Sequence, residues 1–169
     1  MRSRIPGGQR MQTIYFAGGC LWGAQAFVKM PPGVVATEAR RANGASDNLD
    51  RPYGGYAECV KTTFDERRMT ATELMGRFFE IIDPYSANRQ EADVGEKYRT
   101  SVYSEDPSHL REAEARIWAR PDCDKTRVEA LPLTRYLPSG EEHQDHLDKF
   151  PNDYRHIPNA LMRKYLPKG

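Results

Sequence analysis

The hydrophobic and polar positions of the chain alternate with a strand-like period of two in some stretches and recur every three to four residues in others. Turn-forming residues, such as the pair Gly18-Gly19, separate these stretches. The alternating stretches predict strands at 11–17, 34–40, 56–64, 101–103 and 127–131. The stretches with helical spacing predict helices between Gly19 and Pro31, from Thr70 to just before Pro84, and from Asp106 to about Ala119.

Two of these helices begin at recognisable start signals. Thr70 and Glu73 have the spacing of a capping box, in which each side chain binds a backbone N–H of the first turn. Asp106 is a good N-cap residue, and Pro107 follows it at the first helical position. The resulting order, βαββαβαβ, predicts an α+β fold: a mixed β-sheet with helices packed over it, around a ferredoxin-like βαββαβ core.

The length of 169 residues is that of one ordinary domain with a sizeable core. We expect a flexible leader at 1–11, the functional domain at 12–150, and a C-terminal tail without cysteine at 151–169. The leader is basic, but no apolar stretch of the length required for a secretion signal follows it.

The charge balance argues against two classes of partner. The chain has 25 basic and 24 acidic residues and a net charge of +1, with no long block of either sign, so we expect no nucleic-acid partner. It contains no apolar run of about 20 residues, so we expect no membrane insertion. Three scattered cysteines are too few for a disulfide framework, which favours a cytoplasmic, reducing location.

Cys20 stands where the first expected strand gives way to a helix. The unpaired N–H groups and the positive dipole end of that helix would stabilise a thiolate at this position, and the two glycines before it leave the sulfur accessible. The neighbouring Trp22 offers an apolar face to a substrate. The alternative is a buried structural cysteine, because free cysteine is among the most buried residue types.

Three other residues are candidates for acid-base or hydrogen-bonding chemistry. Glu58 stands in an otherwise neutral strand, and a carboxyl group buried among apolar neighbours keeps its proton near neutral pH and can act as a general acid. Asp93 and Tyr98 add a carboxylate and a phenol in a glycine-containing segment. The alternatives are an edge-strand glutamate facing water and an ordinary solvated loop.

Four separated segments of the sequence resemble one family. They are "GGCLWG", "GYAE", "DPYSANRQEADVGEKYRTSVY" and "LPSGEEHQDHL". In order and approximate spacing they are similar to the peptide methionine sulfoxide reductases of type A, and the resemblance extends from about residue 14 to residue 147. It implies that 12–150 is a catalytic sulfoxide reductase domain.

The resemblance also implies a role for each matching residue. Cys20 would attack the sulfur of a methionine-S-sulfoxide, free or in a protein, while Trp22 helps to enclose its S-methyl group. Glu58 would protonate the departing oxygen, and Asp93 and Tyr98 would hold water, the oxygen or the substrate backbone by hydrogen bonds. The products are methionine and a Cys20 sulfenic acid. No cofactor is implied; an external thiol such as thioredoxin, glutaredoxin or a small thiol would reduce the enzyme again.

Some positions depart from the family pattern around the expected substrate site. Leu21 stands where the family usually has phenylalanine, and Arg41 where it commonly has tyrosine. His143 matches the family, whereas Glu142 and His146 replace aromatic residues. We expect Leu21, Arg41 and His143 to contribute to substrate binding. Two alternatives are open for the sulfoxide oxygen: Glu58 and Tyr98 activate it alone, or Arg41 supplies a charged donor in place of the tyrosine.

The other cysteines and histidines are expected to be structural or exposed. Cys59 follows Glu58 on a strand, so its side chain points to the opposite face and into the core. Cys123 lies between Asp122 and Asp124, which disfavour its thiolate. His143 and His146 have no third and fourth partner at a recognisable spacing, so we expect no metal site. His109 is expected at the surface.

Two other functions are compatible with the same residues. The altered aromatic positions fit a thiol-based redox sensor, or a reductase of another small sulfoxide on the same fold. A non-catalytic peptide-binding module is disfavoured, because a binding module has no need of a proton donor at Glu58.

Overall fold

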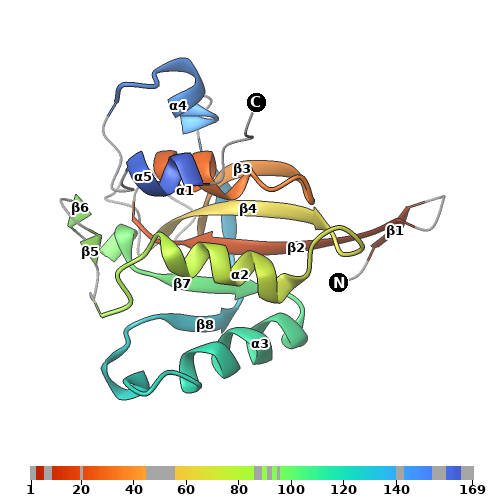
Figure 1. Ribbon diagram of the computed structural model, residues 1–169, viewed down its shortest axis with the longest axis vertical. Helices are drawn as coiled ribbons and strands as arrows, with labels where there is room; N and C mark the ends of the chain where they lie inside the picture. Colours follow the sequence, from red (N-terminus) through yellow and green to blue (C-terminus); the bar gives the residue numbers. More distant parts are fainter. Residues whose placement is uncertain are drawn as a thin grey trace.

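The structure is a computed structural model of the 169-residue chain (Figure 1). It describes residues 3–5, 9–19, 21–44, 56–85, 89–90, 93–94, 96–139, 143–153 and 159–164.

One mixed sheet forms the centre of the fold (Figure 1). Its strands lie in the order β8-β7-β2-β4-β3-β9, and β1 pairs with the start of β2. All neighbouring pairs are antiparallel except β7 with β8, which is parallel. The strands are β1 Ser3–Ile5, β2 Gln9–Ala17, β3 Val34–Ala42, β4 Ala57–Asp65, β7 Ser101–Ser104, β8 Glu129–Pro132 and β9 Tyr136–Pro138.

The remaining elements are helices and one small hairpin-like pair. Strands β5 and β6 pair with each other in a separate two-stranded sheet. Their bounds are Arg89–Gln90 and Asp93–Val94. The helices are α1 Leu21–Val28, α2 Ala71–Glu80, α3 Pro107–Trp118, α4 His146–Lys149 and α5 Asn159–Lys164, with single 3₁₀ turns η2 Glu96–Tyr98 and η3 Cys123–Lys125. None of the helices in the described part of the chain is both long enough and apolar enough to span a bilayer.

The predicted helix starts at α2 and α3 are confirmed. The Thr70 hydroxyl accepts a hydrogen bond from the Glu73 backbone at 3.1 Å, and the Glu73 carboxylate accepts one from the Thr70 backbone at 3.2 Å. The Asp106 carboxylate accepts from the Ser108 backbone at 2.9 Å. These contacts satisfy N–H groups that the first turn of a helix leaves without a partner.

Helices α1, α2 and α3 cover one face of the sheet and form the main core with it. Phe16 on β2 packs against Phe78 on α2, with ring centroids 4.8 Å apart. The other residues of this core include Phe27 of α1, Phe64 of β4 and Ala113 of α3, all completely or almost completely buried. The expected α+β fold with helices over a mixed sheet is therefore confirmed.

The opposite face of the sheet is concave. The rings of Tyr15 on β2 and Tyr136 on β9 are 5.8 Å apart, although β4 and β3 lie between those two strands. Neighbouring strands are about 4.8 Å apart, so a flat sheet would separate β2 from β9 by about 14 Å. The sheet is therefore curled into a half-barrel, and a second, smaller cluster that includes Cys59 and Tyr103 packs with Tyr15 inside the curl.

One expectation about the surface is wrong. His109 was expected to be exposed, but it is 3% exposed and lies on the inner side of α3. Its Nε2 donates to the Gln12 side-chain oxygen at 2.6 Å, and its Nδ1 is 2.7 Å from the Ser104 hydroxyl. The two hydrogen bonds compensate the desolvation of the ring, which is why a histidine can occupy this buried position.

Candidate active site

A double-glycine turn connects β2 to α1. A Cβ on Gly18 would lie 2.6 Å from the Ile82 side chain, so only glycine fits there. Gly19 has a φ of 79°, a left-handed conformation that glycine adopts without strain. Helix α1 begins at Leu21. Cys20, the predicted nucleophile, lies outside the described residues, and its two neighbours in the chain define this turn and the helix start.

Glu58 lies at the N-terminus of α1. It belongs to β4, is 5% exposed, and faces the helix side of the sheet with Val60. Its Oε2 accepts a hydrogen bond of 3.2 Å from the backbone N–H of Leu21. This N–H is one of those that a helix leaves without an internal partner, so the carboxyl group occupies the polar end of the helix next to the position of Cys20 in the sequence.

Arg41 is the neighbour of Glu58 across the sheet. The two residues are directly paired in the β3–β4 register, so their side chains leave the sheet on the same face. Arg41 is half-buried. Arg41, at a position where the resemblance implies tyrosine, therefore places a cation beside the candidate acid.

The segment with the predicted Asp93 and Tyr98 runs past the same turn. The backbone N–H of Gly19 donates to the carbonyl of Tyr98 at 3.4 Å, and the Tyr98 side chain is half-buried. The Asp93 backbone belongs to β6 and pairs with Gln90; its side chain lies outside what the structure describes. The structure thus brings the backbone at Tyr98 to the start of α1.

Two histidines of the C-terminal part of the chain contact Trp22 of α1. The indole N–H of Trp22 donates to Nδ1 of His143 at 3.1 Å, so this nitrogen carries no proton. The ring of His146 stacks on the indole, with centroids 3.7 Å apart and planes inclined by 10°. Nε2 of His146 donates to the Asp153 carboxylate at 2.7 Å. His146, at a position where the resemblance implies a larger aromatic residue, covers the tryptophan with a flat ring.

Residues 143–153, here called the histidine segment, are attached to the rest of the fold by amide side chains. The Gln144 amide binds both backbone groups of Ala39, accepting from its N–H at 2.8 Å and donating to its carbonyl at 2.9 Å. Gln25 of α1, which is 1% exposed, accepts from the Asp145 backbone at 2.9 Å. Lys29 forms ion pairs with Asp145, at 3.2 Å, and with Asp148.

Sequence reasoning missed Gln25 and Gln144. The signal for Gln25 was a single amide in an otherwise apolar helical run, where a buried polar side chain needs a partner. Gln144 gave no signal of its own, because only the folded chain brings it beside β3.

The two described cysteines differ in their surroundings. Cys59 is 1% exposed inside the curled sheet, and burial raises the pKa of its thiol, with the Arg40 charge opposing that effect only in part. Cys123 is half-buried in η3, between α3 and β8. A hydrogen bond from Tyr85, together with one from Arg120, holds the pKa of the adjacent Asp122 below its ordinary value, so a negative charge lies beside Cys123.

The two histidines are occupied by contacts with protein groups. His143 Nδ1 accepts from Trp22, and His146 Nε2 binds Asp153. Within the described ranges, no group of three or more histidine, cysteine, aspartate or glutamate side chains has the arrangement of a metal site.

Comparison with known proteins decides the family. The sequence profile described as peptide methionine sulfoxide reductase matches residues 12–168. The peptide methionine sulfoxide reductase MsrA of Clostridium acetobutylicum is 36% identical over 162 residues, which cover 92% of this chain and 100% of the relative. The chain belongs to the peptide methionine sulfoxide reductase family. The MsrA of Clostridium perfringens is 38% identical over 87% of this chain and 98% of its own length.

Two solved structures share the fold. Methionine sulfoxide reductase A of Corynebacterium diphtheriae superposes with a TM-score of 0.77 at 29% identity, covering 92% of this chain and 85% of that one. Reduced Mxr1 from Saccharomyces cerevisiae superposes with a TM-score of 0.79 at 25% identity, covering 92% and 93%. The predicted resemblance to the type A reductases is therefore confirmed.

Proposed function

We propose that this chain reduces methionine-S-sulfoxide, free or in proteins, to methionine, with Cys20 as the nucleophile and Glu58 as the general acid. The observation that carries the proposal is the position of the Glu58 carboxyl group: it is 5% exposed and hydrogen-bonded to the Leu21 N–H at the start of α1. Cys20 immediately precedes Leu21 in the chain, so this proposal places the acid and the thiol at the same end of α1.

The reaction balances with these two groups and one external reductant. The Cys20 thiolate gives an electron pair to the sulfoxide sulfur while Glu58 transfers a proton to its oxygen, which is a poor leaving group until it is protonated. The attack forms an S–S bond and leaves a hydroxyl group on the substrate sulfur. This hydroxyl group then passes to the Cys20 sulfur as the S–O and S–S bonds to the substrate break, and the electron pair of the S–S bond stays on the methionine sulfur. Methionine departs, and Cys20 is left as a sulfenic acid. Two external thiol groups then reduce the sulfenic acid to the thiol, releasing water and a disulfide.

The substrate would bind between the start of α1 and the histidine segment. The Trp22 indole, fixed by His143 and covered by His146, presents an apolar surface for the S-methyl group. Leu21, 2% exposed, adds an aliphatic wall. Tyr98, Asp93 and Arg41 would hold the sulfoxide oxygen or the methionine backbone, and Arg41 is supported by its place directly across the sheet from Glu58.

The same proposal covers the architecture, the reductant and the location. Residues 12–150 form the catalytic domain, and the chain order β2-α1-β3-β4-α2-β7 with antiparallel neighbours supports a ferredoxin-like core.

We infer a cytoplasmic location, where scattered thiols remain reduced. Mxr1 has also been solved in complex with Trx2, and a thioredoxin-type protein is the reductant to test first.

The test uses the separated R and S epimers of a methionine sulfoxide derivative with dithiothreitol as the reductant. The purified chain should reduce the S epimer alone. Cys20→Ser should abolish turnover, whereas the matched variant Cys59→Ser should retain most of it, because Cys59 lies inside the curled sheet. If neither epimer is reduced by the folded protein, the reductase proposal is wrong; peroxide-driven oxidation of Cys20 under the same conditions would then favour a redox sensor.

A further inference from the structure

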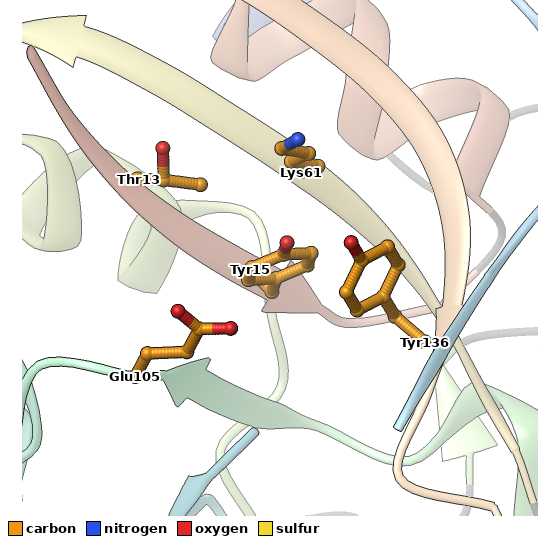
Figure 2. Close-up of a pocket in the computed structure, with 5 residues that line it drawn as sticks. All are labelled: Thr13, Tyr15, Lys61, Glu105 and Tyr136. Atoms are coloured by element: carbon orange, nitrogen blue, oxygen red, sulfur yellow. The ribbon is translucent and has the colours of Figure 1, made fainter. Parts of the chain in front are cut away.

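A pocket lies on the concave face of the sheet, on the face opposite to Glu58. Tyr15 and Lys61 are paired across β2 and β4, and their neighbours in sequence, Phe16 and Val60, point to the helix side. The pocket has a volume of about 190 Å³. Figure 2 shows the side chains that line it around one space: Thr13 and Tyr15 of β2, Lys61 of β4, Tyr136 of β9, and Glu105, which follows β7.

Tyr15 directs its hydroxyl group into this pocket. The residue is 5% exposed, and its hydroxyl has no hydrogen-bond partner among the described residues (Figure 2). Burial, together with the nearby Tyr136, raises the pKa of Tyr15 to about 12. The phenol therefore keeps its proton at physiological pH and is available as a hydrogen-bond donor. A ligand in the pocket can accept this hydrogen bond in place of water.

The pocket also carries one charge of each sign. Within the described part of the chain, neither Lys61 nor Glu105 has an ion-pair or hydrogen-bond partner. The neighbouring Arg40 pairs through Nη2 with Glu38 at 2.7 Å, and its guanidinium group lies over the Tyr136 ring at 4.8 Å from the centroid. Lys61 and Glu105 are thus the two charged groups of the pocket that remain open to a ligand.

We propose that this pocket binds a small zwitterion of the α-amino acid class. The ligand carboxylate would accept hydrogen bonds from Lys61 and Tyr15, and its ammonium group would donate to Glu105. A simple anion would leave its charge facing Glu105, and a simple cation would face Lys61, whereas a zwitterion satisfies both.

Size and position agree with this class of ligand. Pockets for drug-sized molecules begin at about 300 Å³, so a cavity of about 190 Å³ suits a smaller molecule. Ligand sites are frequent in the mouths of β-barrels, and the curl of this sheet forms half of such a mouth. The Tyr15 and Tyr136 rings, with centroids 5.8 Å apart, supply apolar walls for an aliphatic side chain.

A matched set of three ligands tests the charge requirement. L-valine carries both groups, 3-methylbutanoate lacks the ammonium group, and isobutylamine lacks the carboxylate; none of them is a sulfoxide or a thioether. In calorimetric titrations, valine should bind saturably, and each single-charge analogue should bind at least about tenfold more weakly. Absence of saturable valine binding overturns the proposal, and equal affinity for 3-methylbutanoate overturns the zwitterion assignment.

Variants then place the ligand in this pocket. Lys61→Gln and Glu105→Gln should each weaken valine binding at least about tenfold, while the exposed matched controls Lys125→Gln and Glu114→Gln should not change it. The reversed pair K61E/E105K should restore part of the affinity that K61E alone removes, which a purely structural role would not do. Glu58→Gln should leave valine binding unchanged. Retention of full affinity in both pocket variants overturns the proposal.

If a variant does not fold, an NMR experiment on the wild-type chain still tests where valine binds. With tyrosine rings labelled with ¹³C, valine should shift the resonances of Tyr15 and Tyr136. Saturable binding without a shift at either ring would place the ligand elsewhere and overturn the proposal.

Discussion

The Glu58 carboxylate accepts a 3.2 Å hydrogen bond from the backbone N–H of Leu21, at the first turn of α1. This contact joins the middle of the sheet to the helix end that follows Cys20. It fixes the carboxyl group at the start of α1, where the proposed mechanism requires a proton donor, and the group is removed from water, since Glu58 is 5% exposed.

Replacing Glu58 by glutamine tests the proton transfer. Glu58→Gln keeps the side-chain oxygen that accepts from Leu21, so the melting temperature should change little, but the amide cannot deliver the proton. Sulfenic acid formation in a single turnover should slow by about 10²-fold or more, the usual scale of general acid catalysis. Glu114→Gln, on the exposed side of α3, is the control and should react at the wild-type rate. An unchanged single-turnover rate in Glu58→Gln would exclude it as the acid.

The sequence offers signals for the candidate chemistry-bearing residues but not for the residues that support them. Glu58 could be identified because a lone carboxylate in a neutral strand contrasts with its neighbours. The contact between Trp22 and His146 could not, because the two residues are more than one hundred positions apart in the sequence and meet only after the histidine segment docks through Gln144. Local spacing carries no information about such a contact.

The stack of His146 on Trp22 predicts an effect on substrate affinity. His146→Ala removes the flat ring from the indole, and aromatic pairs contribute about 0.5–1.5 kcal/mol, so KM for the sulfoxide should rise by up to about tenfold while kcat changes less than about twofold. His146→Phe retains a ring and should restore KM. In a Trp118→Phe background, where Trp22 is the remaining tryptophan, the Ala variant should also show altered indole emission.

A control variant separates the effect of the stacked His146 ring on KM from the effect of the charge on Asp153. Asp153→Asn removes the carboxylate that His146 Nε2 contacts at 2.7 Å but leaves the ring in place, so it should have a smaller effect on KM than His146→Ala. Equal KM values for wild type and His146→Ala would show that the stack does not support the substrate site.

Burial predicts that Cys59 is chemically inert in the folded protein. Its thiol is 1% exposed and burial raises its pKa, so the reactive thiolate is scarce even at mildly alkaline pH. In the Cys20→Ser variant at pH 8, iodoacetamide should therefore modify Cys123 and leave Cys59 intact, and both should react after denaturation in guanidinium chloride. Alkylation of Cys59 at the rate of Cys123 in the folded chain would contradict its position in the curled sheet.

The fold could be predicted where the local pattern determines the element. The capping box at Thr70 and the Asp106-Pro107 start are local signals, and both helices begin there. The curl of the sheet could not be predicted, because it depends on β9 pairing with β3 across a large separation in sequence and on the contact of Tyr136 with Tyr15. His109 was misplaced for the same reason, since Gln12, its partner on β2, is distant in the chain.

The last prediction is that Cys20 is oxidised to a sulfenic acid that forms no internal disulfide. A disulfide requires Cα atoms within about 7 Å and side chains that face each other. Cys59 points into the curl, on the face opposite to Glu58 and α1, so it can reach the helix end only if β4 is rebuilt. Cys123 sits in η3 beyond α3, and Asp122, kept ionised by Tyr85 and Arg120, disfavours the thiolate that would have to attack. After one equivalent of sulfoxide without reductant, dimedone should add to Cys20, and peptide mapping should find no peptide cross-linked through it. A Cys20–Cys123 disulfide in good yield would contradict this and make Cys123 the resolving residue, with a disulfide reductase of the thioredoxin type as the enzyme's partner.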